Sequence, residues 1–195
     1  MDPATAIGSV FAAVGLSGAA GLNAYLPLLA GALLERLGVV ELGEPFGALS
    51  SDAGIAVLAA LLAADVVADK VPGVDHLLHV AGAVIHPVAG ALLFVGGTGP
   101  ETGIPAAVAA ILGAATAETV HGGRAALRPA STATTAGVGN PVLSLAEDLG
   151  SLALTVLAFA APLVALLVVL ALLAAAIGGV RRLVGAAARR PRGRG

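Results

Sequence analysis

Long apolar runs constrain the fold more than any other feature of this sequence. They cover residues 4–34, 53–71, 76–95, 104–127 and 142–177. A helix of about 20 apolar residues is long enough to cross the ~30 Å hydrocarbon core of a bilayer. Only 11% of the residues are charged, whereas soluble domains carry about 25%. The sequence therefore predicts an all-α, polytopic transmembrane bundle of about five to six spans, with the lipid bilayer as its solvent.

Two of these runs are too long for one straight span. Residues 4–34 would form a helix of about 46 Å, and glycines, Asn23 and Pro27 interrupt its middle. Two readings fit this pattern: a re-entrant or unwound segment, or a tilted helix whose small residues pack against a neighbour. A hairpin here would bring the count to six spans. In residues 142–177, Pro162 predicts a kink.

Polar connections separate the runs. Glu35–Asp52 is too polar to span and predicts a loop or an interfacial segment, and Gly96–Gly103 predicts another loop. Pro72 and Gly73 suit a tight turn, after which Asp75 suits the N-cap of the third span. Arg128–Pro141, rich in Ser, Thr and Gly, predicts a further polar loop that could present hydroxyls and backbone N–H groups to an anion.

Charge and composition divide the chain into a transmembrane bundle over residues 1–178 and a basic, disordered tail over 179–195. Six of the ten basic residues lie in that tail, and short basic flanks stay in the cytoplasm, so we expect a cytoplasmic C-terminus. The N-terminus lacks the basic segment of a signal peptide. Aromatic residues make up only 3%, which argues against a nucleic-acid partner. The absence of cysteine excludes disulfides and thiolate metal sites.

Several ionisable residues lie deep inside the apolar runs. Asp65 is one turn further in than Asp69, which suits a solvated helix end. His86 lies about 16 Å beyond Asp75 along a helix, near the middle of a ~30 Å core. His79 falls on the same face as Asp75 and His86. Polar groups at such a depth need a partner, a wet cavity or a ligand.

Glu118 is the deepest acidic residue, because its run begins at Ile104 and the next polar stretch begins only at Arg128. An ionised acid at that depth costs about 2.5–3.5 kcal/mol on insertion scales. Glu118 and His121 form an E-x-x-H pair of the kind used in bundle metal sites. A complete metal site would need further carboxylates, and the candidates are Asp65, Glu147 and Asp148. The alternative is a hydrogen-bonded or ion-paired network with Arg124. No motif identifies a cofactor.

A shift of 53 to 54 positions sets Asp65 against Glu118 and His86-Pro87 against Asn140-Pro141. This alignment predicts an internal repeat, although Ala- and Val-rich sequences also align by chance. Paired Pro-interrupted segments point to the binding sites of transporters. Asn140 therefore joins the candidate residues, and Asn23, four residues before Pro27, joins them as a third such break.

Four motifs together resemble a known family. They are GLNAYLPLL (21–29), ADKVPGVDHLLH (68–79), HP (86–87) and RPASTATTAGVGNPVLSLAED (128–148). Over most of residues 10–175 the chain resembles a bacterial integral-membrane family known as domain of unknown function four-one-two-six. The resemblance implies an inner-membrane protein. It supplies no activity and no catalytic residues.

Three classes of function fit these observations. A small transporter or channel for an ion or polar solute is favoured by the deep ionisable residues and broken helices. A membrane-embedded enzyme and a structural or assembly protein, the latter including a homo-oligomer, are the alternatives. We expect the deep polar residues to converge in the bundle interior. The binding or transport candidates are Glu118, His121, Asp65, His86, Asn140, Asn23, Asp69, His79 and Arg124.

Overall fold

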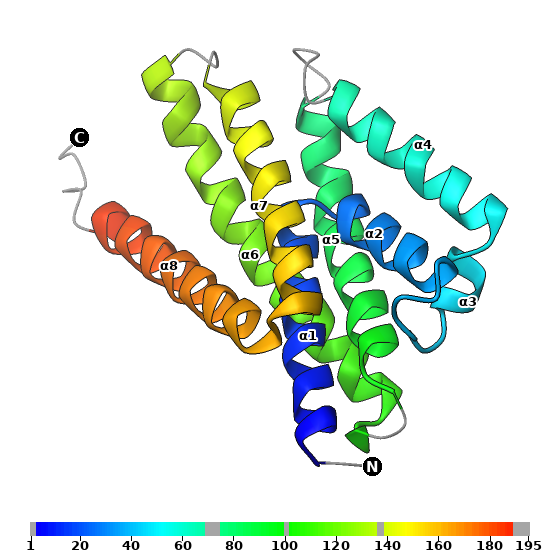
Figure 1. The fold of residues 1–195 in the computed structure, drawn as a ribbon. Coiled ribbons are helices and arrows are strands. Elements are labelled where there is room, and N and C mark those ends of the chain that lie inside the picture. The colour runs from blue at the N-terminus through cyan, green and yellow to red at the C-terminus, as the bar shows by residue number, and fades with distance from the viewer. Residues whose placement is uncertain (1–2, 69–74, 100–101, 136–138, 189–195) are drawn as a thin grey trace, which may run out of the picture.

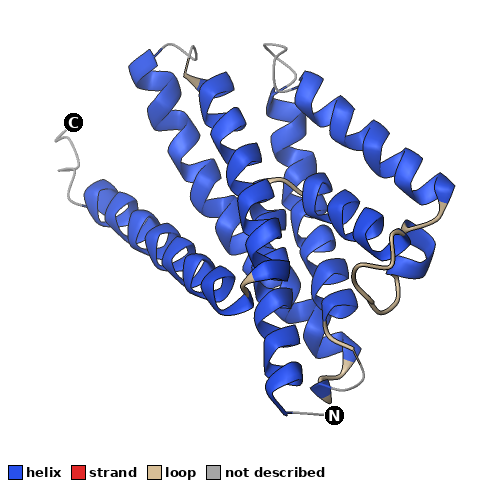
Figure 2. Cartoon of the chain, viewed as in Figure 1, coloured by secondary structure: helices blue, strands red, loops and turns tan. Residues whose placement is uncertain are grey.

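Helices account for all the regular secondary structure in the part of the chain that the computed structural model describes. That part comprises residues 3–68, 75–99, 102–135 and 139–188, with side chains described over 3–68, 81–99, 102–126 and 139–182. The helices are α1 (Pro3–Leu22), α2 (Tyr25–Arg36), α3 (Phe46–Leu49), α4 (Asp52–Ala68), α5 (Asp75–Gly97), α6 (Ala106–Thr135), α7 (Asn140–Ala160) and α8 (Pro162–Ala188). Figures 1 and 2 show that helices make up most of the described chain. The all-α prediction is confirmed.

Helix α1 is the central element, because α5, α6, α7 and α8 all pack against it (Figure 1). Small residues make these close approaches feasible. A Cβ on Gly15 would lie 2.8 Å from Ala165 Cβ of α8, and a Cβ on Gly21 would lie 2.6 Å from the Ala117 carbonyl oxygen of α6. Helices that associate in lipid use small residues in this way, since backbones must approach closely to gain packing energy.

The crossing of α5 and α6 is the tightest in the bundle. A Cβ on Gly113 would collide with the Gly90 carbonyl oxygen and lie 2.6 Å from Phe94 Cβ. The hydroxyl of Ser17, in α1, donates to the same Gly90 carbonyl oxygen at 2.9 Å. These contacts fix the middle of α5 against both α1 and α6, and His86 lies one turn before Gly90.

The first apolar run is broken at Asn23. Helix α1 ends at Leu22 and α2 begins at Tyr25, and Figure 1 shows α2 leaving α1 at an angle. The side-chain oxygen of Asn23 accepts hydrogen bonds from the N–H groups of Tyr25 and Leu26, both at 3.0 Å. Helix α2 has 12 residues, about 18 Å, which is too short to cross a ~30 Å core. Of the two readings of this run, the break is the one that the structure adopts.

Three predicted boundaries need correction. Pro162 does not merely kink a long helix, because α7 ends at Ala160 and α8 runs back in a different direction (Figure 1). The stretch from Arg128, predicted as a loop, remains helical to Thr135, and no glycine occurs between positions 128 and 135. Helix α8 likewise continues to Ala188, into the predicted tail, and residues 189–195 lie outside the described chain.

Three described helices are long and apolar enough to cross a membrane: Pro3–Leu22, Asn140–Ala160 and Pro162–Arg182. The apolar part of α5, Ala81–Gly97, is shorter. The helix α8 is the most exposed of these, with Leu167 57% and Leu170 50% accessible. A soluble surface would not carry so continuous an apolar face, so the chain is a membrane protein.

Candidate functional site

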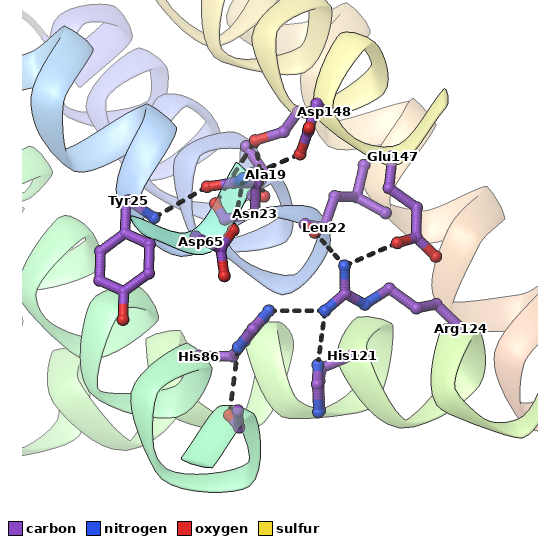
Figure 3. Close-up of polar contacts among 12 residues, drawn as sticks. Ala19, Leu22, Asn23, Tyr25, Asp65, His86, His121, Arg124, Glu147 and Asp148 are labelled. Atoms are coloured by element: carbon purple, nitrogen blue, oxygen red, sulfur yellow. Dashed lines mark hydrogen bonds and ion pairs between the residues drawn. The ribbon is translucent and has the colours of Figure 1, made fainter. Parts of the chain in front are cut away.

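Asn23, at the break between α1 and α2, joins two carboxylates from distant parts of the chain. Its Nδ2 atom donates to Asp148 Oδ1 of α7 at 2.8 Å and to Asp65 Oδ2 of α4 at 3.2 Å (Figure 3). Its side-chain oxygen is engaged by the first turn of α2. With a side chain that is only 3% exposed, Asn23 is a buried hub that ties α1, α2, α4 and α7 together.

Arg124 of α6 forms a second hub beside the first. Its Nη1 atom donates to Glu147 Oε2 of α7 at 2.9 Å and also to the carbonyl oxygen of Leu22. Leu22 is the last residue of α1, where carbonyl groups lack helical partners. The ion pair is largely buried, with 17% of the Arg124 side chain and 12% of the Glu147 side chain exposed. Arg124 therefore satisfies both a carboxylate and the broken end of α1.

Arg124 also sets the hydrogen-bonding roles of two histidines. A guanidinium can only donate, so its Nη2 atom donates to His86 Nε2 at 2.9 Å and to His121 Nδ1 at 3.3 Å. The proton of His86 then lies on Nδ1, which donates to the Gly82 carbonyl oxygen at 3.1 Å. Both imidazoles, with ring centroids 4.0 Å apart, are neutral in this arrangement.

These side chains form one polar cluster in the bundle interior. We use "polar cluster" for Asn23, Asp65, His86, His121, Arg124, Glu147 and Asp148. Six helices, α1, α2, α4, α5, α6 and α7, contribute to it or to its immediate supports, and Figure 3 shows the side chains pointing toward one another. His86 lies midway along α5, eleven residues from each end, or about 16 Å. The structure thus brings together Asn23, Asp65, His86, His121 and Arg124 of the predicted site residues.

The remaining predicted residues lie elsewhere or outside the described chain. Glu118 takes no part in the cluster, and its Oε2 atom is buried without a hydrogen-bond partner. Asn140 is the first residue of α7, two turns before Glu147. Asp69 lies outside the described residues, as does the side chain of His79. Among the side chains that the structure describes, no group of three His, Asp or Glu residues is arranged to hold a metal ion.

The sequence prediction included Asn140 of α7, and Glu147 and Asp148 as candidates for a metal site, but it did not include the buried hydroxyl groups of α7. Its buried polar residues are Ser144, Ser151 and Thr155, which share one side of the helix with the acidic pair at 147 and 148. The Ser151 hydroxyl donates to the Ala19 carbonyl oxygen of α1 at 3.0 Å. The signal was present in the sequence, because polar residues recur there at intervals of three or four within an otherwise apolar run.

A cavity of about 540 Å³ lies beside the cluster, between α6, α7 and α8. Arg124 and Glu147 form part of its wall, and the other lining residues are apolar or glycine, among them Leu22, Val120 and Leu172. A transport path through Glu118 would need a cavity that reaches this side chain. Glu118 does not line this cavity; the Arg124–Glu147 ion pair does.

Comparison with known proteins gives a match to one family. The family described as Domain of unknown function (DUF4126) matches residues 10–182, which agrees with the resemblance predicted from the sequence. No curated protein and no solved structure matches the chain.

Proposed function

This chain belongs to the DUF4126 family, and on that premise we propose that it moves an ion or small polar solute across a membrane through the polar cluster. The observation that carries the proposal is the break at Asn23, which brings a buried amide, carboxylates and imidazoles together beside a broken helix. Interrupted helices that meet polar side chains in the bundle interior are typical of transporter binding sites. Irregular backbone is tolerated at membrane depth where protein or a cavity surrounds it.

The proposed topology has five or six spans. Helices α1, α5, α6, α7 and α8 are long enough to cross, since the shortest of them, α1, has 20 residues, or about 30 Å. Helix α4, with 17 residues, would be the sixth. The proposed location is the bacterial inner membrane with a cytoplasmic C-terminus, because Arg181 and Arg182 begin the basic end of the chain.

The chemistry of the cluster suits a proton or a small cation. Asp65 and Asp148 present carboxylate oxygens to the same amide nitrogen of Asn23, and a cation could replace that N–H donor. The neutral imidazoles of His86 and His121 add sites that gain a proton near neutral pH in ordinary surroundings. Glu118, Asn140, Asp69 and His79 remain proposed parts of the path to or from this site.

The test is ion flux into liposomes that contain the purified full-length chain, followed with dyes sensitive to pH or to the added ion. Asp65→Asn removes a charge while keeping the shape and an oxygen that can accept from Asn23. We expect it to reduce flux to the empty-liposome rate. The matched control is Asp52→Asn, because the Asp52 side chain is 90% exposed and its ion pair with Arg36 lies at the surface. Glu118→Gln tests the same role for the acid outside the cluster.

The second candidate function is structural, and the density of Arg124 contacts favours it. One guanidinium reaches α1, α5 and α7, and buried polar groups can hold membrane helices together without binding a solute. Wild-type liposomes that pass no proton, metal cation or small anion above background would refute transport. A fall in the thermal stability of Asp65→Asn relative to wild type would then support the structural function.

A further inference from the structure

The cavity beside the polar cluster has the lining of a lipid site rather than of a water-filled channel. Its walls come from α6, α7, α8 and the end of α1. Apart from Arg124 and Glu147, they consist of alanine, glycine, valine and leucine. The charged atoms of that pair are engaged with each other and with Leu22, His86 and His121. The space that remains is therefore bounded mostly by hydrocarbon.

The helices that flank this cavity are apolar on their outer surfaces. On α7, Leu145 is 59% and Leu149 58% exposed, and on α8, Ile177 is 46% and Val180 45% exposed. In a membrane these side chains face lipid tails. Small residues between them, such as Ala146 on α7 and Ala175 on α8, leave the space that forms the groove.

The chemistry of the groove indicates what kind of molecule can occupy it. A water molecule in a cavity needs two to four polar partners, which most of these walls lack. A flexible methylene chain is narrow enough and gains free energy from every apolar contact that it makes with the walls.

We propose that this groove binds one acyl chain of a membrane phospholipid, held between α7 and α8 against α6. The chain lies against the outer side of the Arg124–Glu147 pair, whose charges face the polar cluster. This proposal does not depend on transport, because it rests on the shape and lining of the groove. In this proposal, the direction in which α8 leaves the bundle serves to hold lipid.

The test uses the full chain in liposomes that contain a trace of phospholipid with a photoactivatable diazirine in its acyl chain. After illumination, peptides are mapped for label. In wild type we expect label concentrated on the groove faces of α6, α7 and α8. The double variant Ala146→Phe/Ala175→Phe fills the groove from both walls. It should lower this label about tenfold, which corresponds to ~1.4 kcal/mol of binding.

The matched control is Leu149→Phe/Leu167→Phe, which adds two rings at outward positions that are 58% and 57% exposed. It should leave the groove label unchanged. A competition experiment with wild type needs no variant to fold. Unlabelled phospholipids with different head groups, or free fatty acid, are added as competitors, and the one that lowers the label shows which kind of lipid supplies the acyl chain. Three results would each overturn the proposal: label spread in proportion to exposure, label unaffected by the double variant, or label lost as the chain self-associates, which would place a second copy on this face.

Discussion

Replacing Arg124 tests whether the two hubs of the site depend on its charge. Arg124→Leu would leave the Glu147 carboxylate, 12% exposed, without the cation that faces it. It would also remove the donor to the Leu22 carbonyl oxygen at the end of α1. Removing one partner of a buried ion pair costs about 3–5 kcal/mol, and a lost partner for a buried carbonyl costs about 1–3 kcal/mol. Because these contributions overlap, we expect a loss of about 4 kcal/mol.

The double variant Arg124→Leu/Glu147→Leu gives the decisive comparison. Replacing a whole buried ion pair by apolar residues is often neutral or stabilising, so the double variant should lose less than either single variant. It should retain only the cost of the Leu22 carbonyl and the two histidines, about 1–3 kcal/mol. Unfolding of each purified variant in mixed detergent micelles, followed by circular dichroism, measures all four corners of the cycle.

A stabilising interaction between Arg124 and Glu147 is refuted if the loss of stability in the double variant equals the sum of the losses in the two single variants. That additivity would mean that Arg124 and Glu147 do not stabilise each other. A loss below about 1 kcal/mol for Arg124→Leu alone would equally contradict it, because exposed ion pairs have values of that size. In that case the 2.9 Å contact would be no stronger than an exposed pair.

Three further outcomes follow from other parts of the molecule. Asn23→Leu should destabilise the chain by about 2–3 kcal/mol in the same assay, because the partly buried Asp148 carboxylate and two backbone N–H groups lose their partner. Gly113→Ala, whose Cβ would collide with the Gly90 carbonyl oxygen, should cost about 1–3 kcal/mol, whereas Gly122→Ala, with nothing within 4 Å, should not. Burial raises the pKa of Glu35, and the charge of Glu44 adds to this, outweighing a hydrogen bond with the Leu42 backbone that lowers the pKa. The contribution of Glu35 to the free energy of unfolding is therefore complete below its ordinary pKa and is lost as the pH rises through the folded-state pKa. Glu35→Gln should for this reason raise the melting temperature at pH 7 but not near pH 4.

The sequence was sufficient to predict the helical class and much of the site, because few backbone structures satisfy all their hydrogen bonds in lipid. Asn23, Asp65, His86, His121 and Arg124 stood out as polar residues among apolar neighbours, and such groups must find one another inside a bundle. No sequence rule states which of them meet. That pairing depends on helix crossings such as Gly90 on Gly113, which only three-dimensional packing decides.

Glu118 shows what position along an apolar run leaves open. Depth in the sequence measures distance from a helix end but not the direction in which a side chain faces. Two positions on α6, Ala117 and His121, face the neighbouring helices α1 and α5, and Glu118 lies about 100° further round the helix from Ala117. Pro162 was similarly ambiguous, because a proline predicts an interruption but not whether the chain bends or turns back.

The break at Asn23 has a consequence for how the chain is made. Its partner Asp148 follows 125 residues later, and at ~5–20 residues per second the ribosome needs ~6–25 s to reach it. During that interval the end of α1 and the start of α2 have been synthesised, but neither the Asp148 carboxylate nor the Arg124 guanidinium is in place. The early segments must therefore wait near water or beside the insertion machinery. Chains truncated before α7 should be recognised and degraded as unfinished.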